Sequence, residues 1–336
     1  MSKYRIPDRN RPYLNVLDFL VRERNFLIIV LIGTILAQIA TGYGRAAMWL
    51  GFLFAAYAAV ANDSIQSLGT FIESNKKKKW WTLWLYVGVI FLVTVTFSWI
   101  YFDGDVTFQR LLKPNGETDY DSGGITSVVF KSMSGYAMAF ILSFIVWYFS
   151  YNIIKKYFKS RKHHPIWTII QWTVSGSLWA VWVMQDGANI AVFLPRQQSL
   201  TEFIIFASTI FLGLGFLFYL RGDKIQKVVS EKVRISDVRA ATLIDFTYVL
   251  LLIYKLFIST VPLSTTWVFL GIIGGREIAV SIARNKRGNS HKVKSLRMIG
   301  KDVGSAFAGL IISVGLAMGA NPGIREEVYQ SIMNLF

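Results

Sequence analysis

Ala61-Asn62-Asp63-Ser64-Ile65-Gln66-Ser67-Leu68-Gly69-Thr70 is a polar stretch inside a region that is otherwise apolar from Ala46 onward. It contains a carboxylate, two amides and three hydroxyls. An ionisable side chain at such a depth in an apolar segment is costly, which indicates a functional site. A second polar stretch, Gln185-Asp186-Gly187-Ala188-Asn189, lies in the other half of the chain. We expect the two stretches to form one binding site for a small ion.

The composition of the chain is that of a polytopic membrane protein. Hydrophobic residues make up 53% of the 336 residues, and the mean hydropathy is +0.43. Ordinary soluble domains are less apolar than this. Several uncharged runs reach the length of about 20 residues that crosses a bilayer core. The predicted fold class is therefore all-α and polytopic, with roughly 8–10 membrane segments, each of about that length.

The net charge of +16 does not indicate a nucleic-acid partner. Lys and Arg lie between the apolar runs, as in Lys76-Lys77-Lys78-Lys79 and residues 155–162, where cytoplasmic loops retain basic residues. No soluble segment shows a basic face with interleaved aromatic residues, so nucleic acid is excluded as an expected partner. The chain has no Cys, which excludes disulfides and thiolate metal sites. We expect a multi-pass protein of the cell membrane, specifically a bacterial inner membrane.

The order of apolar and basic segments predicts four regions. They are a cytoplasmic N-terminal segment at residues 1–25, a first membrane repeat at 26–160, a second membrane repeat at 161–320, and a C-terminal tail at 321–336. The alternation of sides sends the span with Asp63 inward and the span with Asp186 outward. Opposed directions are typical of inverted-repeat transporters, which bind ions near the midplane in broken helices. The acidic loop at residues 103–124 lacks the ordered carboxylates of an EF-hand, and its role stays open.

The two polar stretches share one pattern, which is an amide, an Asp, two further residues and a second amide. Asn62, Asp63 and Gln66 form the first copy, and Gln185-Asp186-Gly187-Ala188-Asn189 forms the second. In a helix, the amides at positions i and i+4 share one face. Small residues surround both copies and permit a close approach of the backbone to a ligand.

These residues resemble the inorganic phosphate transporter (PiT) family, which also includes sulfate permeases. The first stretch is similar to the family signature GANDVANAFGT, and Met184-Gln185-Asp186-Gly187-Ala188-Asn189 looks like a degraded second copy. Val261-Pro262-Leu263-Ser264-Thr265-Thr266, followed by Gly271, is similar to the family segment PVSTTHA-G. The resemblance implies a transporter, not an enzyme, that couples sodium to the uptake of an oxyanion.

The resemblance also implies the site residues. The expected sodium ligands are Asp63, Asp186, Asn62 and Asn189. The expected anion-binding residues are Asn62, Gln66, Ser67, Gln185, Asn189, Ser264, Thr265 and Thr266. Gln66 and Gln185 replace Asn in the signature, and Trp267 stands where His usually follows. Phosphate is the first candidate, and sulfate or a related oxyanion is the alternative.

The chemistry of the residues agrees with cation coupling. Two aspartates alone would repel an anion, so a cation must lie between them and the anion, or the aspartates must be protonated. Sodium is the expected coupling ion and the proton is the alternative. The expected partners are sodium, the oxyanion and the lipid bilayer, with a homodimer as a permitted assembly.

Other interpretations stay open at this point. Asp63 or Asp186 could pair with Lys131, Lys255 or Arg45 and hold helices together. Asp245 and Lys255 belong to no recognisable motif, which favours a structural role for both. An ion channel, a membrane scaffold and an intramembrane aspartyl protease are competing classes. The protease class needs a Gly-x-Gly-Asp segment, whereas the nearest stretch is Gly213-Leu214-Gly215-Phe216.

Overall fold

The computed structural model describes residues 24–40, 42–108, 124–157, 164–220, 237–257, 264–284, 290–320 and 322–333. Within these ranges the regular structure is helical throughout and contains no strand, which confirms the all-α prediction. The expectations for residues 1–23, for 109–123 of the acidic loop and for Val261, Pro262 and Leu263 fall outside the described ranges.

Most of the described helices follow the apolar segments, whereas the helix that begins at Ser290 starts in a basic stretch and the last described helix is polar. The bounds of the described helices are α2 (Arg24–Ala40), α3 (Gly44–Ala58), η1 (Ala59–Asp63), α4 (Ser64–Ser74), α5 (Trp80–Tyr101), α7 (Gly124–Tyr157), α8 (Ile166–Ile190), α9 (Leu200–Tyr219), α11 (Val238–Phe257), α12 (Thr265–Arg284), α13 (Ser290–Ala320) and α14 (Pro322–Met333). The predicted C-terminal tail includes helix α14. Pro322 suits its first position because a proline there fixes the backbone angle and removes no helical hydrogen bond.

Five of the described helices are long and apolar enough to cross a membrane. They are Gly44–Ser74, Trp80–Tyr101, Met133–Tyr151, Leu200–Tyr219 and Thr265–Ala283. Large apolar side chains on their outer faces are exposed in the isolated chain, as Phe97 of α5 and Phe216 of α9 illustrate. Outward apolar side chains are what a helix in contact with lipid requires. The chain is therefore a helical membrane protein, while the exact number of crossings stays a prediction.

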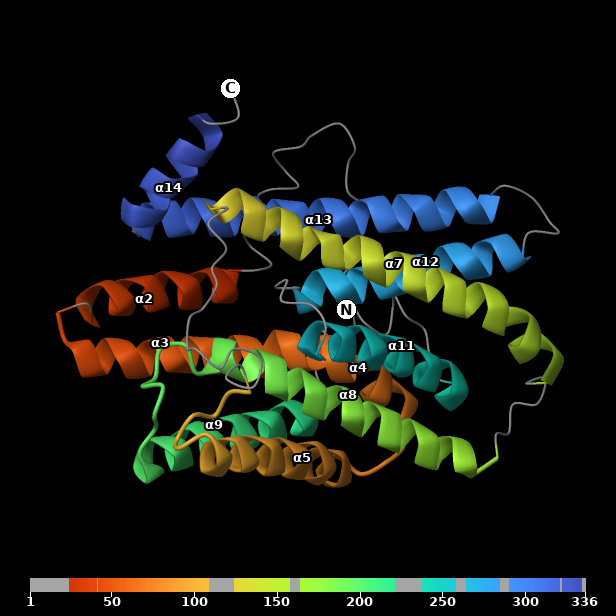
Figure 1. Ribbon diagram of the computed structural model, residues 1–336, viewed down its shortest axis with the longest axis horizontal. Helices are drawn as coiled ribbons and strands as arrows, with labels where there is room; N and C mark the ends of the chain where they lie inside the picture. Colours follow the sequence, from red (N-terminus) through yellow and green to blue (C-terminus); the bar gives the residue numbers. More distant parts are fainter. Residues whose placement is uncertain are drawn as a thin grey trace, which may run out of the picture.

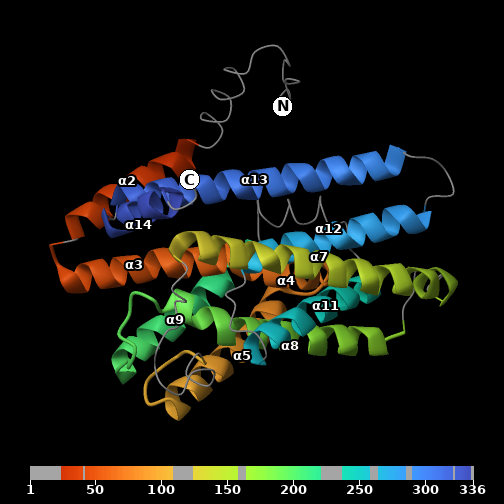
Figure 2. The ribbon, with the colours of Figure 1, turned by 45° about the horizontal axis from the view of Figure 1, so that its top comes forward.

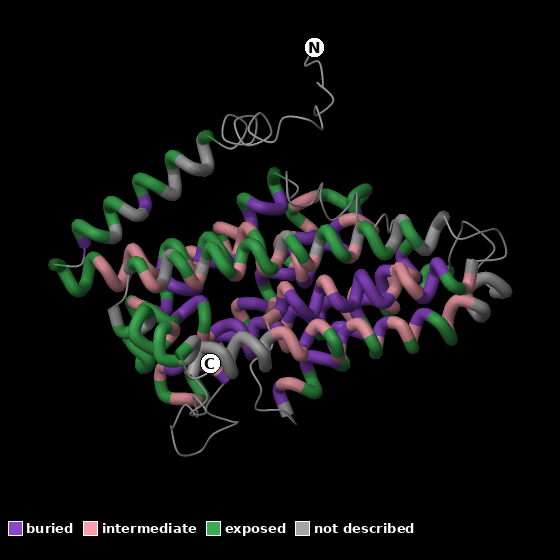
Figure 3. Tube along the Cα trace, turned by 90° about the horizontal axis from the view of Figure 1, so that it is seen from above, coloured by how far each residue is buried: buried purple, intermediate pink, exposed green. Residues whose placement is uncertain are grey.

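The helices form layers, and α8 and α11 lie in the middle one (Figure 1). The α5–α9 pair covers one side of the layer made by α3, η1, α4, α8 and α11, and the α7–α12 pair covers the other (Figure 2). Helix α13 lies outside α12. Buried residues concentrate in the central helices when the molecule is seen from above (Figure 3). This arrangement encloses α4, α8 and α11, which carry most of the buried polar side chains among the described residues.

Glycines allow α12 to pack directly against α7. A Cβ atom at Gly271 would lie 2.5 Å from the carbonyl oxygen of Tyr136, and one at Gly275 would lie 2.2 Å from that of Phe140. Ser143 of α7 donates a hydrogen bond of 2.7 Å to the Ile272 carbonyl. Small residues spaced four apart are the usual means by which membrane helices bring their backbones together. The α7–α12 pair is therefore a rigid wall beside the middle layer.

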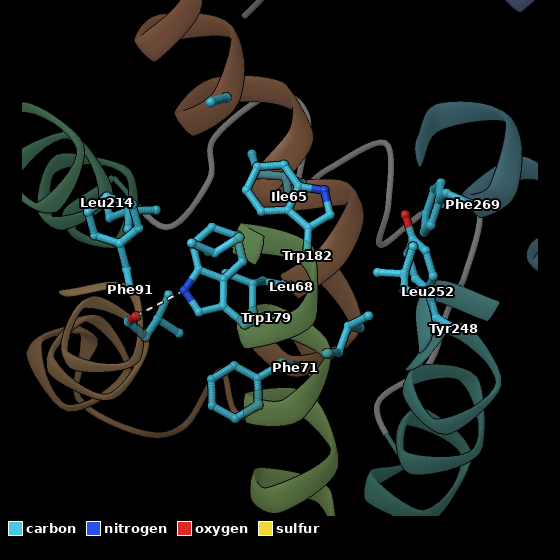
Figure 4. Packing of buried hydrophobic residues seen from close by; sticks show 14 of the residues in the cluster. Ile65, Leu68, Phe71, Phe91, Trp179, Trp182, Leu214, Tyr248, Leu252 and Phe269 are labelled. Atoms are coloured by element: carbon cyan, nitrogen blue, oxygen red, sulfur yellow. Dashed lines mark hydrogen bonds between the residues drawn. The ribbon is translucent and has the colours of Figure 1, made fainter. Parts of the chain in front are cut away.

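Aromatic side chains fill the core between α4, α5 and α8. Trp179 and Trp182 stack with their ring centroids 4.9 Å apart. The indole N–H of Trp179 donates a hydrogen bond of 3.0 Å to the Val87 carbonyl (Figure 4). Ile65 and Leu68 of α4 lie beside these rings (Figure 4). Packing and this hydrogen bond explain the position of Trp179. The buried indole N–H of Trp182, by contrast, has no acceptor among the described residues.

Candidate ion-binding site

The first polar stretch lies on a π-helical turn rather than in a broken helix. Residues Ala59–Asp63 form η1, and the N–H of Ser64 donates to the carbonyl of Ala59, five residues earlier. The sequence predicts an unwound backbone here, but the helix continues from Gly44 to Ser74 with this one wide turn. The physical reason is that a π-turn inserts a residue and redirects the side chains while keeping the backbone hydrogen-bonded. Such turns are frequent at functional sites.

The second polar stretch also keeps its helical backbone. Gln185 and Asp186 are buried near the end of α8, which continues to Ile190, and Asn189 is exposed. The prediction of a broken helix is therefore wrong at this position as well. Gly187 lies close to the chain after α5, since a Cβ atom there would be 3.5 Å from the carbonyl oxygen of Val106.

The two aspartates lie on antiparallel helices, close enough to interact electrostatically. Three contacts fix the register of α4 against α8. Asn75 hydrogen-bonds Gln171, Thr70 and Ser175 share one carboxylate partner, and Asp63 interacts electrostatically with Asp186. Residue numbers rise along one helix as they fall along the other, so the chain directions are opposed (Figure 1). The structure thus brings Asp63 and Asp186 together.

Hydrogen bonds fix the orientation of the amides in the first copy. The Asn62 Nδ2 donates to Asp63 Oδ1 at 2.8 Å, and the Gln66 Nε2 donates to Asn62 Oδ1 at 3.2 Å. An ionised carboxylate only accepts, so the Asn62 amide nitrogen must face Asp63 and its oxygen must face Gln66. The Gln66 amide nitrogen therefore points back along the helix, and its oxygen Oε1 points away from it. The predicted shared face of the two amides is present in this copy.

The same reasoning orients the second copy. Gln185 Nε2 donates to the Leu252 carbonyl of α11 at 2.5 Å, and a carbonyl only accepts. The Gln185 oxygen Oε1 must therefore face the other way. Asn189 Nδ2 donates to Asp186 Oδ1 at 2.9 Å. The other carboxylate oxygen, Oδ2, receives no hydrogen bond from the described residues.

Three acceptor oxygens at the site have no hydrogen-bond donor among the described residues. They are Gln66 Oε1, Gln185 Oε1 and Asp186 Oδ2, and all three are buried. A buried acceptor without a partner costs about 1–3 kcal/mol, so native structures rarely keep several together. Hard cations take carboxylate and amide oxygens as ligands. Two of these oxygens belong to the amides of the two copies and the third belongs to Asp186, so the two copies supply oxygens of the kind that a small cation binds.

Hydrogen-bond donors lie on the α11 side of the same site. Lys255 and Tyr248 of α11 both interact electrostatically with Asp186. The buried indole N–H of Trp182 has no acceptor in the described part of the chain, and it points to the side where Tyr248 and Leu252 lie (Figure 4). An ammonium group and an indole N–H are donors that an oxyanion can use.

The hydroxyl segment at the start of α12 reaches this site through Tyr248. The Tyr248 hydroxyl donates to the Thr265 carbonyl at 3.1 Å and is also hydrogen-bonded to Ser67. Ser67 in turn donates to the Asp63 carbonyl at 3.2 Å. Thr265 is buried, whereas Ser264 and Thr266 are partly exposed. The link between this segment and the aspartates is thus a backbone carbonyl, rather than the three hydroxyls that the resemblance implies.

Of the three basic residues considered as structural partners of the aspartates, the structure supports Lys255. Asp186 interacts electrostatically with Lys255, as the helix-pairing interpretation expects. Arg45 is exposed at the start of α3. The Lys131 side chain lies outside the described residues.

Sequence reasoning named Asp245 with a structural role and missed the polar residues around it, deeper in the same interface. Asp245 of α11 accepts hydrogen bonds from Thr70 and Ser175. Gln171 and Asn75 form a second junction beyond it, through a bond of 3.0 Å. The available signal was the spacing along α11, because Asp245, Tyr248, Leu252 and Lys255 recur at three or four residues and thus share a helix face.

Comparison with known proteins yields no relative for the chain. No family model matches it, and no curated protein or solved structure matches it. In the described residues, no group of three or more His, Asp or Glu side chains could hold a metal ion. The site is consequently one of amides and paired carboxylates, and its function must be argued from this chemistry.

Proposed function

We propose that the protein is a secondary transporter that couples a cation, sodium first, to the symport of an inorganic oxyanion. One observation carries the proposal. Asp63 interacts electrostatically with Asp186, three buried acceptor oxygens of the two copies (one of them on Asp186) lack donors among the described residues, and Lys255 of α11 interacts with Asp186. Phosphate is the first candidate and sulfate the alternative. The resemblance of both polar stretches to the inorganic phosphate transporter family agrees with this function.

Electrostatics provides the coupling between the two ions. Asp63 and Asp186 repel each other when both are ionised, so each gains from a cation placed between them. Bound sodium would use the free oxygens of Gln66, Gln185 and Asp186. With that charge neutralised, an oxyanion can accept hydrogen bonds from Lys255 and Trp182. Each ion lowers the electrostatic cost of the other, which is a thermodynamic coupling.

The inverted repeat belongs to the same proposal. The segments with Asp63 and Asp186 run in opposed directions, and α5 of the first half packs against α9 of the second. Helix α7 of the first half likewise packs against α12. Helices from the two halves thus lie in contact pairs around the proposed site, as expected when two repeats surround one ion site. A bacterial inner membrane is the location that we infer for such a transporter.

Uptake into proteoliposomes tests the transport proposal. Purified protein is reconstituted, and the uptake of radiolabelled phosphate and of sulfate is measured with and without an inward sodium gradient. We expect accumulation of one anion that depends on the gradient. Absence of uptake of both anions under every gradient, together with no stabilisation of the protein by either ion, would contradict the proposal and favour a scaffold.

Variants of the two aspartates connect uptake to the site. Asp63→Asn and Asp186→Asn are each expected to abolish coupled uptake while the protein still elutes as a folded species. Asp105→Asn is the matched control. Asp105 is a buried carboxylate that pairs with Arg196 at 3.1 Å. Full transport by both site variants would assign the aspartates to structure alone.

A further inference from the structure

Asp245 is a buried carboxylate that the proposed site does not use. Its side chain is 1% exposed and lies at the junction of α4, α8 and α11. The Thr70 hydroxyl donates to Oδ1, and the Ser175 hydroxyl donates to Oδ2 at 2.5 Å. An ionisable residue inside a membrane bundle is expensive to keep and by default indicates a function.

The two hydroxyls are the only partners of Asp245 in the part of the chain that the structure describes. Other charged or titratable side chains do lie on the described helices that pack around it. They are Asp63 on η1, Glu73 on α4, Asp186 on α8, Arg239, Tyr248, Tyr254 and Lys255 on α11, Tyr136, Tyr148 and Tyr151 on α7, and Arg276 and Glu277 on α12. None of these forms an ion pair with Asp245. An ionised carboxylate in this position would therefore keep its charge without a counter-ion.

Asp245 also lies within a polar seam that continues from the candidate ion site. On the chain of α4, the seam passes through Asp63, Ser67, Thr70 and Ser74, at intervals of three or four residues. Such residues share one face of a helix. The facing positions on α11 follow the same spacing through Asp245, Tyr248, Leu252 and Lys255. Helices α4, α8 and α11 lie together in the middle layer (Figures 1 and 2).

The far end of the seam is a junction of amides and a hydroxyl. Asn75 donates to Gln171 Oε1 at 3.0 Å, Gln171 donates to Ser74, and the Trp172 indole N–H donates to Asn75 Oδ1 at 3.1 Å. Directly after it comes Lys76-Lys77-Lys78-Lys79, whose charge assigns this end to the cytoplasm. Asp245 thus lies between the ion site and the cytoplasmic end.

We propose that Asp245 binds a proton in the course of transport, as an intermediate position between the Asp63–Asp186 site and the cytoplasm. This inference rests on the proposed transport function. The two hydroxyls touch the carboxylate directly, and a hydroxyl can donate to the ionised carboxylate or accept from the acid, so these contacts serve both protonation states. The absence of a counter-ion in the described surroundings favours the neutral acid.

The proton step is balanced without any co-reactant. A proton adds to one carboxylate oxygen of Asp245, and the resulting acid donates a hydrogen bond to the hydroxyl oxygen of Thr70 or Ser175. Each hydroxyl both donates and accepts, so it can turn its own hydrogen towards another acceptor. Release towards the cytoplasmic end restores the carboxylate and the original hydrogen bonds.

Proton movement in proteoliposomes tests the proposal. A pH-sensitive dye is enclosed in the vesicles, and inward gradients of phosphate and sodium are imposed on the wild type, on Asp245→Asn and on the control Asp105→Asn. We expect the wild type and the control to move protons with the anion, Asp245→Asn to lose this movement, and Asp245→Glu to regain part of it. Proton movement by Asp245→Asn at the wild-type rate would overturn the proposal.

Infrared spectroscopy provides a readout that does not depend on transport. The wild-type protein in lipid is titrated with acid and base, and the carbonyl band of a buried carboxylic acid is followed. We expect such a band, absent in Asp245→Asn and unchanged in Asp105→Asn. A spectrum without any band from a buried acid over the whole pH range in which the protein stays folded would overturn the proposal. Loss of anion uptake with the band intact would instead contradict the transport function.

Discussion

Replacement of Gln66 by Met tests whether the Gln66 oxygen Oε1 binds an ion or only contributes to the stability of the fold. Gln66 Oε1 has no donor among the described residues, and its Nε2 makes one bond to Asn62 at 3.2 Å. Met keeps the length of the side chain and removes both polar atoms. Loss of a helical amide pair costs about 0.2–0.5 kcal/mol. Removal of an unpartnered buried acceptor returns about 1–3 kcal/mol. Without sodium, Gln66→Met should therefore be as stable as the wild type, or more stable.

Sodium should reverse this order. A ligand that binds only the folded state stabilises it by about 2.7 kcal/mol at one hundred times its dissociation constant. Gln66→Met lacks one ligand oxygen, so most of this stabilisation should be lost. The assay is thermal unfolding in detergent micelles, followed by tryptophan fluorescence, with sodium exchanged for a large organic cation at constant ionic strength.

Gln171→Met is the matched control for this experiment. Both polar atoms of Gln171 are hydrogen-bonded, to Asn75 and to Ser74. Its replacement leaves buried partners unsatisfied and should cost about 1–3 kcal/mol. The loss should be the same with and without sodium, because Gln171 lies outside the ion site. The reasoning is refuted if the two variants behave alike, or if Gln66→Met keeps the full response to sodium.

Two further predictions concern the packing and the charge of the fold. Gly275→Ala places a Cβ atom against the Phe140 carbonyl and should destabilise the protein by about 1–3 kcal/mol. As the control, the Cβ atom in Gly304→Ala meets no atom within 4 Å, and this variant should stabilise α13 by up to about 1 kcal/mol. Equal shifts of the melting temperature in Gly275→Ala and Gly304→Ala would contradict the α7–α12 contact. Hydrogen bonds from Arg239 hold the pKa of Asp237 below its usual 3.8, so this pair stabilises the fold above that pH and the benefit is lost as the pH falls below it. Because Asp237 is half-exposed, Asp237→Asn should cost at most about 1 kcal/mol of stability at neutral pH and nothing in strong acid, as measured by denaturant unfolding. An equal cost at both pH values would contradict a stabilising ion pair between Asp237 and Arg239.

The sequence predicts the class of fold because membrane crossing depends on composition and length. Apolar runs between basic loops suffice to predict helices, and most of the described helices follow those runs. The π-turn at Ala59–Asp63 could not be predicted in the same way. Its sequence has no Pro or Gly, and the wide turn depends on how α3 and α4 pack against other helices.

The pairing of Asp63 with Asp186 could be predicted because both copies carry one pattern of polar residues. Asp245 could not be assigned in this way, since its partners Thr70 and Ser175 lie on two other helices and form no local motif. Spacing along α11 shows which residues share a face, but only the packing of α11 on α4 and α8 shows what that face contacts. The sequence likewise favours a structural role for Lys255, because its partner Asp186 lies on another helix and forms no local motif with it.

The stoichiometry of sodium binding tests most directly whether the two polar stretches form one site. Equilibrium binding of radioactive sodium to the purified protein is measured for the wild type, for Asp63→Asn, for Asp186→Asn and for the double variant, with Asp105→Asn as the control. One site predicts that each single variant loses the sodium bound at these aspartates and that the double variant loses no more than either. Loss of half of that sodium in each single variant, and of all of it in the double variant, would mean two independent sites and would contradict the account.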